Sequence, residues 1–301
     1  MLLKEALGRW WTGEGLYLDP TLGHAGHALA LLERHPGARL LGCDRDPFAL
    51  ALARERLAPF GDRVMTAQAA FREVPAVHAR AGGEPLAGAL LDLGLSSMQI
   101  DDPTRGMSFM HEGPLDLRMN PDEGEPASAR LARVDEDTLA AVLRTHGDLR
   151  GARRLARAII TEAGRGGLPT TRALAALVDR ALGGRPHPRR RAQVFQALRM
   201  WVNEEAEHLE ALLDWLPGAV RAGGVVVTLA YHSGEDRRIK QAMRGRAIGT
   251  PVRRLPMTDA PGAATPWETL TRGVVTPSDD ERDRNPRSRS ARLRAFRRKS
   301  A

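Results

Sequence analysis

The stretch Ala87–Gln99 most constrains how this chain folds, because an apolar run there ends abruptly in small and polar residues. Successive apolar positions without polar alternation are typical of a parallel strand that is covered on both faces. Ligands of such sheets bind beyond the carboxyl ends of the strands. We therefore expect a buried strand over Leu86–Leu93 that delivers Asp92, Ser96 and Ser97 to a ligand-binding edge. A core strand followed by an ordinary loop is the alternative.

The segments before this strand repeat a pattern of strand, turn and helix. Gly15–His27 runs from a short strand into a turn that contains Gly23 and Gly26, and a helix is expected over Ala28–His35. Further strands are expected over Arg39–Asp44 and Arg63–Ala69, with a helix over Pro47–Leu57 between them. Repeated alternation of strand and helix predicts an α/β fold with a doubly wound, Rossmann-like parallel sheet.

The alternation stops after Gln99. Asp101–Pro121 is rich in turn formers and charge, and loops of this length are usually functional. Helices are then expected over Asp137–Thr145, Leu149–Ala163 and Thr171–Leu182, followed by a linker-like basic cluster, Gly183–Arg191, and by a long helix or helix pair, Val194–Leu216. We therefore expect residues 101–200 to form a mainly helical insertion in a domain made of residues 1–100 and 201–301.

The last hundred residues return to the sheet pattern. Gly223–Ala230 is a clear strand, and a helix begins near His232. Thr250–Thr265 is expected to be a loop, and Gly273–Pro277 a last edge strand. The arginine-rich tail Arg282–Lys299 has two interpretations, a disordered basic tail or an arm that contacts a polyanion.

The charge balance points toward an anionic partner. The chain carries 45 Lys and Arg residues and a formal net charge of +8, and only Lys4, Lys240 and Lys299 are lysines. Arginine binds phosphate bidentately and stacks on bases, so a nucleic acid is one explanation, and genome composition is the other. In the insertion, a polyanion surface or a solvated helix face could be formed by Arg150, Arg153, Arg154, Arg157 and Arg165.

Cysteine usage and hydropathy bear on the compartment. The single cysteine, Cys43, cannot form an internal disulfide, which favours a reducing compartment and therefore the cytoplasm. No apolar run approaches membrane-spanning length, so no membrane association is expected. A metal site is not expected either, because His24 and His27 have no third ligand nearby.

Several residues at the predicted sheet edge suit an adenosine-containing cofactor. The glycine turn allows close approach of a ligand to the backbone, although its spacing is not that of the dinucleotide fingerprint. Asp44 ends its strand about 20 residues after the turn, where a carboxylate binds ribose hydroxyls. Asp46, which precedes Pro47, is expected to cap the next helix. Phe71 would pack against adenine or belong to the core. These features do not separate a nicotinamide dinucleotide from S-adenosyl-L-methionine.

Several stretches of the chain, in order, resemble one family, the ribosomal RNA small subunit methyltransferase H or MraW family. The stretches are Thr21–His27, Asp44–Pro47, Leu91–Asp102, Arg105–Met110, Gly113–Met119, Phe195–Glu205, Tyr231–Arg237 and Asn285–Ala291. The chain differs from the usual family pattern at Ala25, where glycine is usual, and at Met107 and Tyr231, where phenylalanine is usual. The resemblance covers nearly the whole chain.

The resemblance implies a class I S-adenosylmethionine-dependent methyltransferase that methylates N4 of a cytosine in the decoding region of 16S rRNA. The partner would be 16S rRNA or the small ribosomal subunit, with the insertion as RNA-recognition domain, and the oligomeric state stays open between monomer and homodimer. The cofactor contacts that carry over from the family pattern are Gly23, Ala25, Gly26, His27, Asp44, Phe71, Asp92 and Gln99.

The chemistry requires an acceptor for a hydrogen of the cytosine amino group, because the nitrogen lone pair is delocalised into the ring. Candidate catalytic residues are Asp92, Ser96 and Ser97, with His232 from the neighbouring strand. Positioning and desolvation should supply most of the rate enhancement, and the target base would have to leave its stack. Two other functions stay open at this point, a nicotinamide-dependent oxidoreductase and a basic RNA-binding protein with a vestigial pocket.

Overall fold

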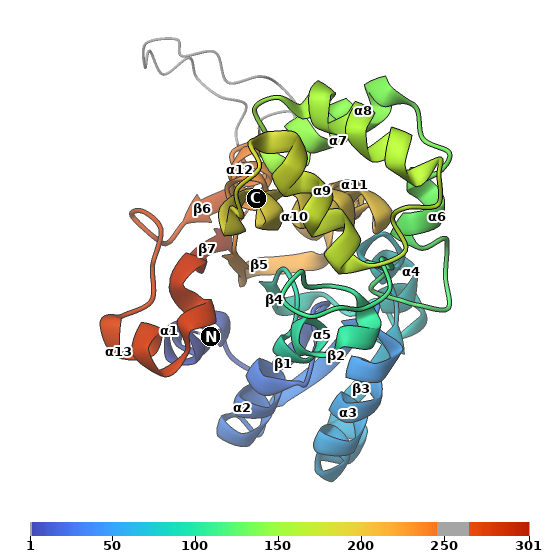
Figure 1. Cartoon of the computed structure of the whole chain (residues 1–301). Coiled ribbons are helices and arrows are strands. Elements are labelled where there is room, and N and C mark those ends of the chain that lie inside the picture. The colour runs from blue at the N-terminus through green and yellow to red at the C-terminus, as the bar shows by residue number, and fades with distance from the viewer. Residues whose placement is uncertain (1, 246–264, 301) are drawn as a thin grey trace, which may run out of the picture. The chain divides into compact units, whose positions relative to one another are not determined.

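The computed structural model describes residues 2–245 and 265–300. The chain divides into two compact units, one made of residues 1–94 and 206–301 and the other of residues 95–205 (Figure 1). We call them the sheet unit and the helical unit. Within the described residues, no helix is both long and apolar enough to cross a bilayer.

The sheet unit is built on a seven-stranded sheet with the order β3-β2-β1-β4-β5-β7-β6. The strands are β1 (Gly15–Asp19), β2 (Ala38–Asp44), β3 (Val64–Gln68), β4 (Leu86–Asp92), β5 (Val220–Ala230), β6 (Trp267–Thr269) and β7 (Arg292–Arg298). The helices are α1 (Leu3–Trp10), α2 (Gly26–Arg34), α3 (Pro47–Leu57), α4 (Val74–Arg80), α11 (Glu205–Ala219), α12 (Ser233–Met243) and α13 (Asp279–Arg284). Strands β1 to β5 pair in parallel, and β7 is antiparallel to both β5 and β6.

Helices cover both faces of this sheet. Successive residues of β4 point to opposite sides, so Leu90 packs in a core with α1, α2 and α3, whereas Leu91 packs in a core with α4, α11 and α12. Both leucines are fully buried, as a strand that is covered on two faces requires. The predicted doubly wound α/β fold is therefore confirmed.

Two predictions for the C-terminal part were wrong. The edge strand is not Gly273–Pro277, where the structure has only an isolated bridge from Val275 to Leu293; the edge strand is β6. The arginine-rich tail is not disordered, because its second half forms β7 inside the sheet, with Leu293, Ala295 and Phe296 buried. The alternative, an arm that contacts a polyanion, stays a prediction. The loop expected at 250–265 lies, except for its last residue, outside the described residues.

The helical unit contains six α-helices, and all of them except the first contribute side chains to its own apolar core. They are α5 (Ser97–Asp101), α6 (Ala127–Leu131), α7 (Glu136–Gly147), α8 (Ala152–Ala163), α9 (Thr171–Leu182) and α10 (Pro188–Val202). The basic cluster Gly183–Arg191 is not a linker throughout, because His187 caps α10 and Pro188 is its first residue. The predicted long helix or helix pair is a pair, divided near Glu204, which has a left-handed φ of 50°.

Candidate functional site

Three carboxylates gather where the parallel strands of the sheet unit end. Asp19, Asp44 and Asp92 are the last residues of β1, β2 and β4. Thr21 connects two of these strands, because its hydroxyl donates to Asp19 Oδ1 at 3.0 Å and accepts the backbone N–H of Asp92 at 2.8 Å. Since the carboxyl edge of a doubly wound sheet is its usual ligand site, this group defines the candidate site.

Asp44 holds the glycine turn in place. Its Oδ2 accepts the backbone N–H of Gly23 at 2.7 Å, and its Oδ1 accepts that of Asp46 at 2.8 Å. Asp46 is itself buried and accepts the N–H of Phe48, so its predicted role as the cap of α3 is confirmed. The two aspartates thus differ in role, since Asp44 holds the glycine turn and Asp46 caps a helix.

The turn delivers the N-terminus of α2 to the same edge. Ala25 is the N-cap residue in a left-handed conformation with φ 59°, which glycine adopts more readily than alanine. An alanine side chain cannot cap the helix, and the first turn, which begins with Gly26 and His27, contains no acidic residue. The positive end of the helix dipole therefore suits an anionic group such as a carboxylate.

Asp92 is held by side chains from two other elements. The hydroxyl of Tyr231, just after β5, donates to Asp92 Oδ1 at 2.7 Å, and His27 Nδ1 lies 3.6 Å from Asp92 Oδ2. Gly94 lets the tyrosine ring approach, because a Cβ at that position would lie 3.3 Å from the ring. The carboxylate is therefore oriented, with its side chain still 23% exposed.

His232 is engaged at the start of α12. Its Nδ1 accepts the backbone N–H groups of Gly234 and Glu235 at 3.2 and 3.4 Å, and its Nε2 lies 3.0 Å from Glu235 Oε1. The imidazole thus uses its acceptor nitrogen as a helix cap and directs the other nitrogen to a carboxylate.

Phe71 lies just after β3, where the chain enters α4. Its ring is partly buried and packs against the core that α4, α11 and α12 share with the sheet. This contact agrees with the core role considered for Phe71. Its packing against adenine stays a prediction.

Ser96, Ser97 and Gln99 belong to the helical unit, where they form the start of α5. The Ser96 hydroxyl accepts the N–H of Gln99 at 3.2 Å, and Gln99 Oε1 accepts the N–H of Ser96 at 2.9 Å. This reciprocal capping box fixes both side chains. Ser97, by contrast, is exposed.

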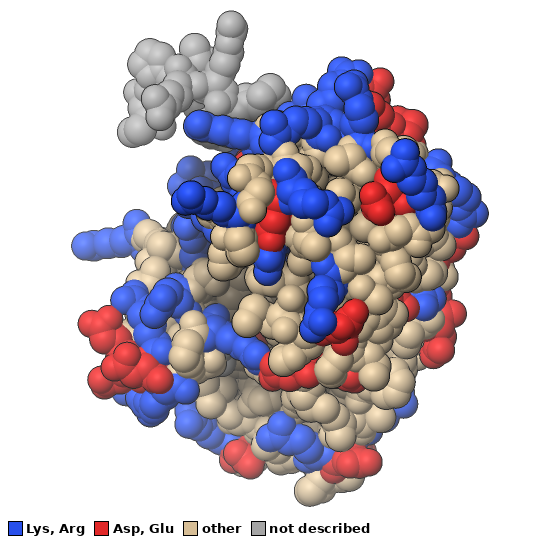
Figure 2. Space-filling model, viewed as in Figure 1, with Lys and Arg blue, Asp and Glu red and all other residues tan. Residues whose placement is uncertain are grey.

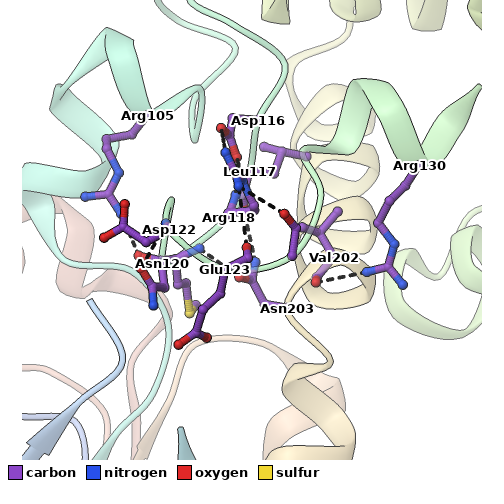
Figure 3. A network of polar contacts seen from close by, with 12 residues as sticks. Arg105, Asp116, Leu117, Arg118, Asn120, Asp122, Glu123, Arg130, Val202 and Asn203 are labelled. Atoms are coloured by element: carbon purple, nitrogen blue, oxygen red, sulfur yellow. Dashed lines mark hydrogen bonds and ion pairs between the residues drawn. The ribbon is translucent and has the colours of Figure 1, made fainter. Parts of the chain in front are cut away.

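Hydrogen bonds fix the backbone of the long loop 101–121 in the helical unit. Asn203 accepts the N–H of Met119 and donates to the carbonyl of Leu117, both at 2.7 Å, and Arg105 donates to the carbonyl of Met119 at 2.7 Å (Figure 3). Close backbone contact explains Gly106, because a Cβ there would lie 1.9 Å from the Pro114 carbonyl oxygen.

Burial makes two of the clustered carboxylates weaker acids. Desolvation, with smaller contributions from neighbouring aspartates, raises the pKa of Asp19 to about 7, although its hydrogen bonds from Thr21 oppose the shift. Desolvation also raises the pKa of Asp44 to about 6. An anionic cluster of this kind favours a ligand that brings hydrogen-bond donors or positive charge.

Asp19→Asn should stabilise the protein increasingly as pH rises. The folded-state pKa of about 7 exceeds the unfolded value of 3.8, so the wild-type folded state binds the extra proton and loses stability as pH rises through 7. Asparagine does not titrate and can still accept the Thr21 hydrogen bonds. Urea unfolding should show the stability difference, variant minus wild type, growing by about 3 kcal/mol between pH 5 and pH 8. A pH-independent difference would contradict the raised pKa.

Sequence reasoning missed three residues of this network, Asp19, Thr21 and Tyr231. Asp19 could have been predicted from the sequence, because it ends its strand as Asp44 and Asp92 end theirs. The contact of Tyr231 could not, since its partner Asp92 is 139 residues away in sequence. Among the described residues, no group of His, Cys, Asp and Glu side chains could hold a metal ion.

Comparison with known proteins decides the family. The model of the MraW methylase family matches residues 2–299, which is nearly the whole chain. The chain belongs to the MraW methylase family. Among its relatives is the ribosomal RNA small subunit methyltransferase H of Sorangium cellulosum, which is 45% identical over 289 residues that make up 95% of this chain and 85% of that protein.

Other relatives of this MraW methylase family member carry the same name. The Cutibacterium acnes protein is 41% identical over 293 residues, 95% of this chain and 86% of its own length. Among solved structures, an rRNA methylase from Streptococcus thermophilus matches with a TM-score of 0.42 and 9% identity, over 98% of this chain and 93% of that one. That likeness is too weak to inform the function.

Proposed function

We propose that this MraW-family chain transfers a methyl group from S-adenosyl-L-methionine to N4 of a cytosine in the decoding region of 16S rRNA, in the cytoplasm. The observation that supports this most directly is Asp92, an oriented carboxylate at the carboxyl end of the central strand β4, in a family whose named members methylate small-subunit rRNA. The helical unit would be the RNA-recognition domain.

The residues at the sheet edge fit the cofactor. Asp44, at the end of β2, would bind the ribose hydroxyls, and Phe71 would pack against adenine. The uncapped N-terminus of α2, with Gly23 and Ala25 in the turn before it, would bind the carboxylate of the methionine moiety. The clustered carboxylates compensate the positive charge that the cofactor carries at its sulfonium and amino groups. When bound, S-adenosylmethionine supplies an electrophilic methyl group.

Asp92 is the best candidate for the acceptor of the amino hydrogen. Its Oδ atoms keep lone pairs beyond those used by Tyr231 and His27, and the side chain is partly exposed. His232 would first have to break the cap of α12, and Ser96 already accepts an N–H within its capping box. A fixed carboxylate also orients the nucleophile for an in-line approach, which is the larger part of the expected catalysis.

The two alternative functions make different predictions about cofactor use. A nicotinamide-dependent oxidoreductase would bind NAD or NADP in preference to S-adenosylmethionine. A basic RNA-binding protein with a vestigial pocket would bind RNA equally with and without S-adenosylmethionine and would show no turnover. Calorimetry with each cofactor, together with RNA binding in its presence and absence, separates the three functions.

Asp44→Ala should weaken S-adenosylmethionine binding far more than Asp46→Ala. Asp44 both holds the N–H of Gly23 in the turn and would offer a carboxylate to the ribose, so its loss should reduce affinity on the order of 10- to 100-fold, which corresponds to the loss of about one hydrogen bond to a charged group. Asp46→Ala removes a helix cap, which lowers stability by about 1 kcal/mol. Equal losses of affinity by calorimetry would reject the assignment of ribose to Asp44.

The proposed activity is tested by incubating the purified protein with methyl-labelled S-adenosylmethionine and small-subunit RNA. Two substrates should be compared, naked 16S rRNA and assembled small subunits. Label should enter the RNA of at least one of them. Failure with both would overturn the proposed function.

A further inference from the structure

Three helix ends meet at one place in the helical unit. Arg154, in the first turn of α8, donates to the carbonyl of Ala181 at the end of α9, and Arg190, in the first turn of α10, donates to the carbonyl of Leu182. The start of α8, the end of α9 and the start of α10 are therefore neighbours. We call the exposed arginines at these ends the arginine cap: Arg150, Arg154, Arg180, Arg185, Arg189 and Arg190.

The arginine cap is not neutralised by acidic side chains. Within the part of the chain that the structure describes, no carboxylate forms an ion pair with any of its members. The acidic residues closest in sequence are Asp148, which is exposed, and Asp179, which is paired with Arg191. In Figure 2, Lys and Arg side chains gather over the face that helices α7, α8 and α9 present in this view.

Other arginines of the same unit are neutralised. Arg153 and Arg157 both pair with Glu136 at the start of α7, and Arg172 pairs with Glu112. These arginines are exposed as well, so exposure alone does not distinguish them from the arginine cap. The difference is the absence of a counter-charge.

The dipoles of α8 and α10 are unfavourable for the arginines in their first turns, whereas the dipole of α9 favours Arg180 in its last turn. Acidic residues stabilise the first turn of a helix, and basic residues there cost about 0.3–1 kcal/mol each. Helix α7 follows the rule with Glu136 and Asp137, whereas the first turns of α8 and α10 contain no acid and carry arginines instead. At this surface two positive helix ends and six arginine side chains face one negative helix end, that of α9, so a bound polyanion would offset the remaining repulsion.

We propose that the arginine cap, a surface of the helical unit, binds the phosphate backbone of the substrate RNA. The inference rests on the proposed function for the identity of the polyanion. Guanidinium groups match phosphate oxygens bidentately, which favours RNA phosphates over isolated carboxylates. Phosphate contacts position a nucleic acid without reading its bases, so the contribution of the arginine cap is to affinity and not to base recognition.

The test compares two triple variants that remove the same charge. The cap variant is Arg150→Gln, Arg185→Gln and Arg189→Gln, which changes exposed side chains that hold no other element in place. The control variant is Arg153→Gln, Arg157→Gln and Arg172→Gln. Binding of a 16S rRNA fragment is measured without cofactor at several salt concentrations, so that RNA binding is read independently of methyl transfer.

The cap variant should bind RNA about 10- to 100-fold more weakly at 0.15 M salt, and the slope of log K against log salt should fall by about 2. The control variant should change both quantities much less, and cofactor affinity should be unchanged in each. Equal losses in the two variants would overturn the proposal, since net charge alone would then explain them. If the wild type binds no RNA, the proposed function itself fails.

Chemical modification of the wild-type protein is a second test of RNA contact at the arginine cap, and it requires no variants. Phenylglyoxal should label the arginine cap readily in the free protein, and bound RNA should protect it more than it protects Arg153 and Arg157. Absence of this selective protection would contradict the proposal even if the cap variant failed to fold.

Discussion

Asp92→Asn is expected to reduce methyl transfer on the order of 10²- to 10⁴-fold, the usual contribution of a positioned proton acceptor. Asparagine keeps the shape of the side chain and can still accept the Tyr231 hydroxyl through its carbonyl oxygen. The loss should therefore fall on kcat, with little change in the melting temperature. Initial rates with labelled S-adenosylmethionine at saturating RNA measure it.

Two comparisons sharpen this result. Asp62→Asn, at an exposed position, is the matched control and should leave the rate unchanged. Tyr231→Phe keeps the Asp92 carboxylate but removes the hydrogen bond that orients it, so kcat should fall, but less than in Asp92→Asn. If Asp92→Asn retains the wild-type kcat, Asp92 is not the acceptor. If only its cofactor affinity falls, its role is in binding.

Asp236→Ala should lower the free energy of unfolding by about 3–5 kcal/mol, because it leaves a buried cation without its partner. Asp236, in α12, is 3% exposed, and its Oδ1 accepts Arg294 Nε of β7 at 2.6 Å. Lys240 Nζ and Arg292 Nη1 lie 3.4 and 3.7 Å from Asp236 Oδ2. Three positive charges would face one another if the carboxylate were removed.

Glu84→Ala is the control for this prediction. Glu84 pairs with Arg39 at 2.5 Å, but both side chains are more than a third exposed, so the pair should contribute no more than about 1 kcal/mol. Burial alone would raise the pKa of Asp236, yet Arg294 and Lys240 lower it overall. The stabilisation is therefore present at neutral pH and is lost as the carboxyl group protonates in acid. If urea unfolding shows that Asp236→Ala and Glu84→Ala lower the free energy of unfolding equally, the proposed effect of the buried ion pair is contradicted.

The same ion pair explains why β7 could not be predicted from its own residues. The strand reads as a basic tail, because arginines separate its buried Leu293, Ala295 and Phe296. The acids that neutralise these arginines, Asp236 and Glu268, lie elsewhere in the sequence. By contrast, β4 and β5 were predictable because contiguous apolar residues specify a strand covered on both faces without reference to distant partners.

The candidate site also has features that the local sequence predicts and features that only the fold determines. The cap formed by Asp46 was predictable, since Pro47 follows it directly and marks a helix start. The position of Asp44 followed from the end of its strand, but its hydrogen bond to Gly23 did not. The contact between Tyr231 and Asp92 joins β5 to β4, so it requires the strand order of the folded sheet. Local pattern thus located the edge, and the fold determined which side chains meet there.

Nucleoside analysis of the RNA product tests the transfer of a methyl group to cytosine N4. RNA from unmodified small subunits is incubated with the protein and S-adenosylmethionine, digested to nucleosides and examined by mass spectrometry against standards. We expect N4-methylcytidine to form with the wild type and to fall sharply with Asp92→Asn. Methylation at another atom or base, or no new methylated nucleoside with either naked 16S rRNA or assembled subunits, would contradict it.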